Sequence, residues 1–448
     1  MFKKMTNASV KLVERLLPDA FIFCIILTIV TFILSMFSTG QGLMDLVIHW
    51  GNGVWKLLGF SMQMALVLVL GNALATSKPV KKLLVSIADI ANSPTQAIML
   101  VSFVSAIACW LNWGFGLIVG ALLAKELAKK VRGVDYRLLI ASAYSGFVVW
   151  HNGISGSMPL QVASDLEQLT TYSQGKITEL IPVGQTLFSY YNLIIAFVII
   201  FTLPLINKLM HPDPEDVVEV DPSKLQEEIL YDNEKASTFA EKVERFSPLS
   251  YLIVLMGIAY LVHHFMKNGF DLNLNIVNLI FLVLGLLFHG TPINYVRAVD
   301  DAVKGAGGII LQFPFYAGIM GLMTGVNASG VSLAHIISQW FVSISSERTF
   351  PLFTFWAAGL VNFFVPSGGG QWAVQGPIMM PASVDLGVDP AKTVVALSWG
   401  DAWTNMIQPF WALPALGVAG LGARDIMGYC LMVLLYTGLI ISLGLVFL

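Results

Sequence analysis

The 448-residue chain is 56% hydrophobic and 12% charged, with a formal net charge of −3 and a mean hydropathy of +0.74. Soluble proteins carry about 25% charged residues. The composition therefore excludes a soluble globular protein and predicts an all-α, polytopic membrane protein. The net charge says nothing about nucleic acid, and no nucleic-acid partner is predicted. Cys24, Cys109 and Cys430 lie in apolar runs without metal or disulfide spacing, so we interpret them as small core residues. No metal or cofactor is expected.

In chain order, a basic N-terminus (residues 1–17) precedes nine apolar stretches that approach the ~20 residues needed to cross a bilayer. We predict these spans at 18–37, 58–77, 138–163, 188–209, 248–266, 273–290, 308–326, 392–417 and 425–448. Two further apolar stretches, 96–126 and 350–382, contain glycine-rich breaks, and we interpret them as re-entrant hairpins. Amphipathic segments at 42–57, 79–92, 293–305 and 330–346 are expected at the membrane interface.

The distribution of basic residues tests this threading. With the N-terminus in the cytoplasm, 20 of the 25 Lys and Arg residues fall on the cytoplasmic side and 5 on the other. Such an excess is what the positive-inside rule predicts. The acidic, proline-containing stretch 211–247 is then a cytoplasmic linker, with a short helix expected near 224–228.

Similar patterns on either side of this linker indicate a two-fold repeat. Gly133-Val134-Asp135 recurs 254 residues later as Gly387-Val388-Asp389, and Asn112 corresponds to Asn362 at an offset of 250. The span at 248–266 has no counterpart, and inserting one span turns the second copy upside down. We therefore predict an inverted repeat of residues 18–210 and 267–448 joined by 248–266, an arrangement typical of secondary transporters.

Four breaks in apolar sequence are the candidate site. The hairpins are predicted to turn at 112–116 and 366–371, and the spans 138–163 and 392–417 to break at 150–157 and at 400–405 with 408–409. Half-helix N-termini attract anions, and freed carbonyl, amide and hydroxyl oxygens suit a small cation. None of these breaks contains Lys or Arg, which favours a monoanion over a dianion.

Two ionisable residues in the breaks carry alternative interpretations. Asp401 lies in an apolar span, where a charge costs a few kcal/mol; it is either a cation or proton site or an interfacial helix cap. His151 is either a proton relay or a neutral, hydrogen-bonded packing residue.

The sequence resembles the bacterial short-chain fatty acid transporter family, the Ato-type uptake proteins, over nearly its whole length. The resemblance rests on Leu111–Ala121, Leu180–Gly184, Asn362–Pro377 and Ile407–Cys430. It implies an inner-membrane permease for acetoacetate, butyrate and similar monocarboxylates. It also implies a member of the broad ion-transporter superfamily, whose members have paired hairpins and often form homodimers. Trp150-His151-Asn152-Gly153 stands where a glycine-rich stretch is expected.

We predict a secondary active transporter that takes up short-chain monocarboxylates across the bacterial inner membrane, coupled to H⁺ or Na⁺. The alternatives are a transporter for another small anion such as a C4-dicarboxylate, and an intramembrane enzyme using Ser155 or Ser157 with His151. No third acid lies near these residues in sequence, so no enzyme is expected. The predicted substrate ligands are Asn112, Gly114, Gly116, Asn152, Ser155, Ser367, Gly368, Gly369, Gly370, Gln371 and Asn405. The predicted coupling-ion or proton ligands are Asp401, Asn362 and His151.

Overall fold

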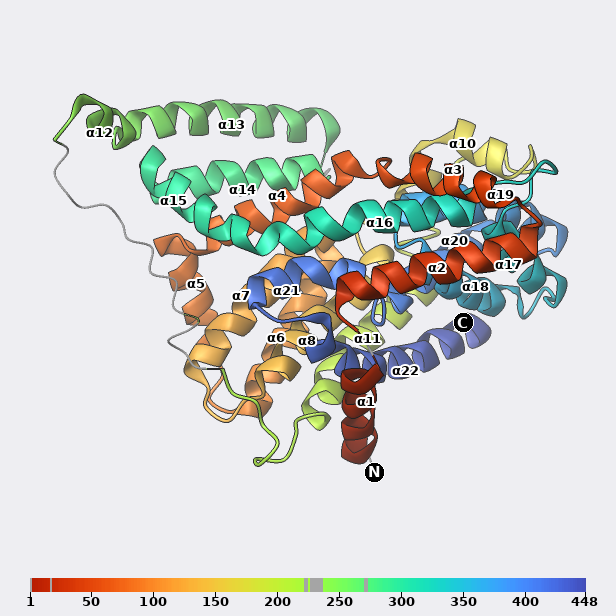
Figure 1. Cartoon of the computed structure of the whole chain (residues 1–448), viewed down its shortest axis with the longest axis horizontal. Coiled ribbons are helices and arrows are strands. Elements are labelled where there is room, and N and C mark those ends of the chain that lie inside the picture. The colour runs from red at the N-terminus through yellow and green to blue at the C-terminus, as the bar shows by residue number, and fades with distance from the viewer. Residues whose placement is uncertain (1, 17, 221–224, 226–236, 270–272) are drawn as a thin grey trace.

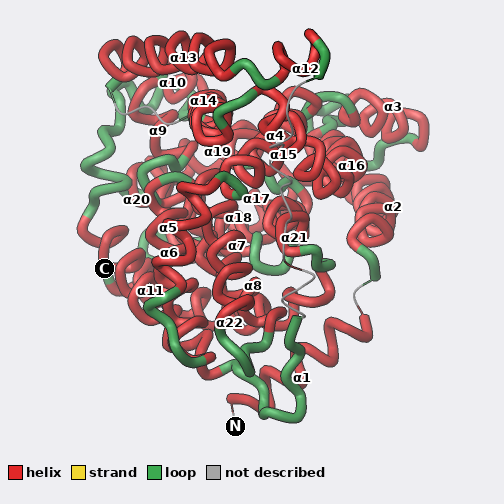
Figure 2. Tube along the Cα trace, turned by 90° about the vertical axis from the view of Figure 1, so that its left-hand side faces the viewer, coloured by secondary structure: helices red, strands yellow, loops and turns green. Residues whose placement is uncertain are grey.

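The computed structural model describes residues 2–16, 18–220, 225, 237–269 and 273–448. Within these ranges the chain consists of helices and loops without a strand, as the colours of Figure 2 show. The prediction of an all-α protein is confirmed. The described ranges contain seven helical stretches long and apolar enough to cross a membrane, which are 20–39, 58–75, 94–111, 190–209, 239–268, 292–324 and 423–447.

The first half of the chain contains both long and short helices. Its elements are α1 (Phe2–Leu16), α2 (Ala20–Thr39), α3 (Leu43–Val54), α4 (Leu58–Ala75), α5 (Lys78–Ala88), α6 (Pro94–Leu111), α7 (Trp113–Lys130), α8 (Tyr136–Ser145), the 3-10 helix η1 (Gly146–Asn152), α9 (Ser157–Ser164), α10 (Leu166–Tyr172) and α11 (Tyr190–Leu209).

The second half begins after the acidic linker, where the predicted helix at 224–228 lies outside the described residues apart from Leu225. Its elements are α12 (Phe239–Glu244), α13 (Ser247–Asn268), α14 (Leu274–His289), α15 (Pro292–Ala302), the 3-10 helix η3 (Val303–Ala306), α16 (Gly307–Thr324), α17 (Leu333–Ser343), α18 (Phe350–Phe364), α19 (Gly368–Asp385), α20 (Pro390–Thr404), the 3-10 helix η4 (Pro409–Ala412), α21 (Leu413–Ala419) and α22 (Ala423–Phe447).

The two halves pack across one another in matching ways. Helix α2 packs on α16 of the other half, and α14 packs on α4. The pair α6–α7 packs against η1, and the pair α18–α19 packs against α20. Helix α13 lies at the upper edge in Figure 1 and contacts α14 and α15. The two-fold repeat and its inversion relative to a bilayer stay predictions.

Both hairpin turns are shorter than predicted. Asn112 alone separates α6 from α7, and its Oδ1 accepts a hydrogen bond from the N–H of Phe115 at 3.0 Å. Ser367 caps α19 in the same way, with its Oγ accepting from the N–H of Gly370 at 3.3 Å. Gly114, Gly116 and the stretch 368–371 are therefore first-turn helical residues. The extents predicted for the turns, 112–116 and 366–371, were wrong because a capping side chain satisfies the N–H groups that a helix start exposes.

Both predicted span breaks are also displaced. In the stretch 138–163 the α-helix ends at Ser145, five residues before the predicted start of the break, and continues as η1 followed by the non-helical residues 153–156. In the stretch 392–417 helix α20 continues through Thr404, so residues 400–404 are helical and the break lies at 405–408. The break predicted at 400–404 was wrong because Gly400 serves close packing. A Cβ there would lie 2.3 Å from the carbonyl oxygen of Phe355 on α18.

Gly400→Ala should therefore push α20 away from α18. Overpacking of this kind costs about 1–3 kcal/mol, and we expect a lower midpoint in thermal unfolding of the detergent-solubilised protein. Gly59→Ala in α4 is the matched control, because no atom lies within 4 Å of its added Cβ, and it should leave the midpoint unchanged or raise it. Equal midpoints for the two variants would contradict this account of Gly400.

Candidate functional site

The tips of both hairpins meet at residues 153–157, which we call the central segment and which comprise the four residues between η1 and α9 and the first residue of α9. On one side, the N–H of Ile154 donates to the carbonyl of Trp110 at 2.8 Å. The N–H of Trp113 donates to Ser155 Oγ at 3.1 Å. On the other side lies Gly368, where a Cβ would stand 2.5 Å from Ser157 Oγ. The central segment thus holds the two hairpin tips at one place, although they are about 250 residues apart in sequence.

Two capped helix N-termini point to the central segment. Helix α7 begins at Trp113 after Asn112, and α19 begins at Gly368 after Ser367. In α19 the N–H groups of Gly370 and Gln371 bond to Ser367. Among the described residues, the N–H groups of Gly368 and Gly369 have no hydrogen-bond partner. Each helix start carries roughly half a positive charge, so this region favours an anion without a basic side chain.

A cavity of about 600 Å³ opens beside the central segment. The described residues that line it include polar side chains of the site, Ser155, Ser157 and Gln161, and an apolar wall. The wall is formed by Leu111, Trp113, Ile154, Leu160, Val183, Leu187, Phe188 and Leu274. No charged side chain is among the lining residues that the structure describes. A small monoanion with a short apolar tail matches this lining.

Behind the cavity wall, His151 connects Ser157 to Asp401. His151 Nδ1 lies 2.6 Å from Asp401 Oδ2, and its Nε2 lies 2.9 Å from Ser157 Oγ. The imidazole and the carboxylate are both fully buried, and the His151 ring stacks on Trp150 at a centroid distance of 4.1 Å. Asp401 lies inside α20 and bonds to His151, so it does not cap a helix.

The hydrogen bonds determine the tautomer of His151. The backbone N–H of Met158 donates to Nε2 at 3.1 Å, so Nε2 is an acceptor and carries no proton. Nδ1 then carries the proton and donates it to Asp401. With this tautomer the imidazole belongs to a polar chain that runs from Asp401 to Ser157, which lines the cavity.

Several buried polar atoms around the breaks have no hydrogen-bond partner in the described part of the chain. They are Asp401 Oδ1, Asn152 Oδ1 and Nδ2, Asn362 Oδ1, Asn405 Nδ2 and Gln371 Oε1. Asn362 Nδ2 donates to Thr404 Oγ1 at 2.9 Å and to Asn405 Oδ1 at 2.8 Å. Unsatisfied groups of this kind are costly and call for an explanation; an ion, a proton or a substrate at the site provides one.

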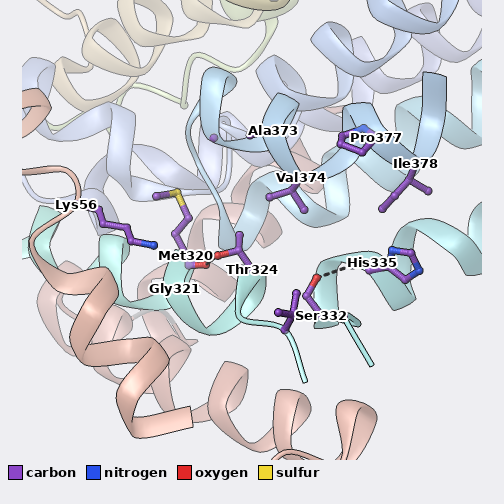
Figure 3. Close-up of a pocket in the computed structure, with 13 residues that line it drawn as sticks. Lys56, Met320, Gly321, Thr324, Ser332, His335, Ala373, Val374, Pro377 and Ile378 are labelled. Carbon is purple, nitrogen blue, oxygen red and sulfur yellow. Dashed lines mark hydrogen bonds between the residues drawn. The ribbon is translucent and has the colours of Figure 1, made fainter. Parts of the chain in front are cut away.

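A second cavity, of about 410 Å³, lies on the other side of the α19 start (Figure 3). Gly370, Met320, Thr324 and His335 line it, and the Lys56 side chain extends towards Met320. The sequence placed no basic residue in the breaks. The tertiary structure nevertheless brings one beside the second hairpin.

The predicted site residues fall into two groups. The first group lies at or near the central segment: Asn112, His151, Ser155, Ser367, Gly368 and Asp401. Gly369 lies close by, because a Cβ added to it would be 3.7 Å from Gln161 Nε2. Gly116 instead packs on the backbone of Cys109, and Gln371 Nε2 donates to the carbonyl of Ala358 on α18. Gln161 was missed, although it follows Ser157 by four residues and so lies on the same face of α9.

Comparison with known proteins supplies the family. The family model described as "Short chain fatty acid transporter" matches residues 1–448. The chain belongs to the short-chain fatty acid transporter family. It is 46% identical over 447 residues, 99% of both chains, to an Escherichia coli K12 protein named "Putative short-chain fatty acid transporter". It is 45% identical over the full length of both chains to a Haemophilus influenzae protein of the same name.

Among solved structures, the chain is similar to that of the Alcanivorax borkumensis YdaH transporter. It shares 18% sequence identity with this chain, covers 96% of this chain and 97% of its own, and gives a TM-score of 0.44. Membership of the transporter family confirms that the chain is a membrane protein with several spans.

Gly368→Ala should displace the second hairpin tip from the central segment, because the added Cβ would lie 2.7 Å from His151 Cε1. We expect transport to fall at least tenfold in reconstituted vesicles. Gly369→Ala is the matched control, since the nearest atom to its Cβ, Gln161 Nε2, is 3.7 Å away. Equal activity of the two variants would show that the contact at Gly368 has no functional role.

Proposed function

We propose that this family member is a secondary active transporter that takes up short-chain monocarboxylates, such as acetoacetate and butyrate, driven by H⁺ or Na⁺. The observation that carries the proposal is the meeting of two capped helix N-termini at the central segment, beside an uncharged cavity with an apolar wall. Transport then proceeds by alternating access around this site. The bacterial inner membrane, a cytoplasmic N-terminus and a homodimer belong to the same proposal.

We place the carboxylate beside Ser157, against which Gly368 packs at the start of α19. The hydroxyl of Ser157 and the amide of Gln161 line the cavity and are the proposed donors. Backbone N–H groups at a helix start bind carboxylates without a basic side chain. The hydrocarbon tail then lies against Ile154, Leu187 and neighbouring apolar residues of the cavity.

The lining also separates monocarboxylates from C4-dicarboxylates. A second carboxylate would project into the apolar wall, where the described lining residues offer it no basic partner. Burying an unpaired charge costs several kcal/mol. The cavity therefore supports a monocarboxylate substrate over a dicarboxylate.

An enzyme is the other candidate, because Ser157, His151 and Asp401 lie in the order of a hydrolytic triad. The acid that the sequence lacked nearby comes from 250 residues away. In a hydrolase, however, the Nε2 lone pair must be free to take the serine proton. Here the N–H of Met158 also donates to Nε2, which opposes protonation there, and we infer that these residues serve transport.

Uptake by proteoliposomes tests the proposal. We expect the reconstituted protein to accumulate labelled acetoacetate and butyrate above the level of protein-free vesicles, which corrects for passive diffusion of the protonated acids. Labelled succinate should not accumulate. Carrier-dependent uptake of succinate without uptake of either monocarboxylate would overturn the proposed substrate class.

Ser367→Ala removes the cap of α19 and should weaken carboxylate binding at its first turn. A lost cap costs about 1 kcal/mol of helix stability. An equal loss in carboxylate affinity would raise the transport KM by about fivefold, which is the change we expect. Ser93→Ala removes an equivalent cap at the start of α6, distant in sequence from the hairpin tip, and should leave KM unchanged. An unaltered KM in Ser367→Ala would remove this residue from the site.

A further inference from the structure

Negative charge on the buried His151–Asp401 pair would oppose the binding of a carboxylate beside Ser157. With His151 neutral and Asp401 ionised, the buried pair carries one net negative charge. The described lining of the adjacent cavity offers no basic side chain to balance it. Lys56 lies in the other cavity, on the Gly370 side of α19. A substrate anion would therefore add a second negative charge to a region of low dielectric constant.

Asp401 has an oxygen atom that could bind the proton needed to remove this charge. Its Oδ2 accepts from His151, whereas its Oδ1 is buried and has no partner among the described residues. A proton on Oδ1 leaves the His151 bond intact and makes the pair neutral. His151 Nε2 is a poorer site, because Ser157 and the N–H of Met158 both approach it as donors.

The two donors at Nε2 also connect Asp401 to the cavity. Ser157 has a single hydroxyl hydrogen, which can go either to Nε2 or to a carboxylate in the cavity. When the hydroxyl turns to a substrate, the N–H of Met158 still satisfies Nε2 at 3.1 Å. Binding of the anion therefore breaks no obligatory hydrogen bond of the pair.

We propose that Asp401 is the proton-binding site of an H⁺/monocarboxylate symporter and takes up a proton at Oδ1 when a short-chain carboxylate binds beside Ser157. The inference rests on the transport function proposed above and names its coupling ion. His151 is a positioning residue that holds Asp401 and links it to Ser157. Because the coupling of two sites is reciprocal, the proton also strengthens substrate binding.

The size of the effect follows from the path between the charges. The contacts from Ser157 through His151 to Asp401 place the substrate carboxylate roughly 10 Å from the Asp401 carboxylate. At an effective dielectric constant near 20, their repulsion changes the affinity for the substrate, and the affinity of Asp401 for its proton, by about tenfold. The sign is fixed: carboxylate binding is tightest at low pH and weakens as pH rises and Asp401 loses its proton.

Other titratable groups lie on the elements that pack against η1 and α20. The described charged residues on these elements are, along the chain, at least nine residues away from His151, Ser157 and Asp401. They are Lys125, Glu126, Lys129, Lys130, Arg137, Lys208, Asp385, Lys392, Arg424 and Asp425. The same elements carry thiols and phenols, of which Cys109, Cys430, Tyr136, Tyr144, Tyr191 and Tyr429 are buried. Of all these groups, Asp401 is the one within hydrogen-bonding distance of His151.

Butyrate binding to the full-length protein in detergent tests the proposal without interference from membrane permeation. Calorimetry in two buffers of different ionisation enthalpy measures proton uptake, over a pH range in which butyrate stays ionised. We expect net proton uptake on binding and a Kd that rises about tenfold from the acid to the alkaline limit. Replacing NaCl by choline chloride at constant ionic strength should leave Kd unchanged.

Asp401→Asn mimics the protonated state. It should bind butyrate at high pH as tightly as the wild type does at low pH, without proton uptake, whereas a merely structural residue would lose affinity. Asp385→Asn, at the exposed end of α19, is the matched control and should behave as the wild type.

Butyrate binding by the wild-type protein tests the role of the proton even where a variant fails to fold. Butyrate binding that requires Na⁺, or that takes up no proton at any pH tested, would overturn the inference and leave the transport function standing. No butyrate binding under any condition, together with no carrier-dependent uptake, would overturn the proposed function and this inference with it.

Discussion

The contact between His151 and Asp401 joins the two halves of the chain through two fully buried side chains. It is a hydrogen bond between fully buried groups that lie 250 residues apart, one in η1 and one in α20. Removing either partner would leave the other buried and unsatisfied, which is far more costly than losing an exposed ion pair. The position of the central segment depends on this bond, because the same imidazole also accepts from Ser157 and the N–H of Met158.

Close packing of glycines supports this arrangement. Gly153 lies against the carbonyl of Trp110, where a Cβ would be 2.1 Å away, and Gly400 lies against the backbone of α18. These contacts allow each hairpin to approach the interrupted helix of its own half. Glycine in a helix costs up to about 1 kcal/mol, and here the cost is offset by tertiary contacts that no larger residue permits.

The site thus combines features that are unfavourable locally. Two helices start inside apolar sequence, a carboxylate is fully buried, and several amides lack partners in the described part of the structure. Local sequence rules are broken together at one place, and functional sites are where such departures are expected. The second cavity, which Lys56 and Gly370 both line, shows that the first turn of α19 faces a space on that side, while Gly368 packs against Ser157.

The sequence by itself determined the class of the protein, because a 56% hydrophobic chain with 12% charge can satisfy its backbone in a membrane only as helices or a closed barrel. It also located the hairpins and the interrupted helices, since glycine, proline and polar residues inside apolar runs are visible without any contact. It placed their boundaries incorrectly, because whether Gly368 or Gly400 ends a helix depends on caps and on neighbouring helices. Only the tertiary structure decided that His151 pairs with Asp401 and that Lys56 lies beside the second hairpin. Those contacts join residues hundreds of positions apart, and no periodicity or spacing in the chain records which of them meet.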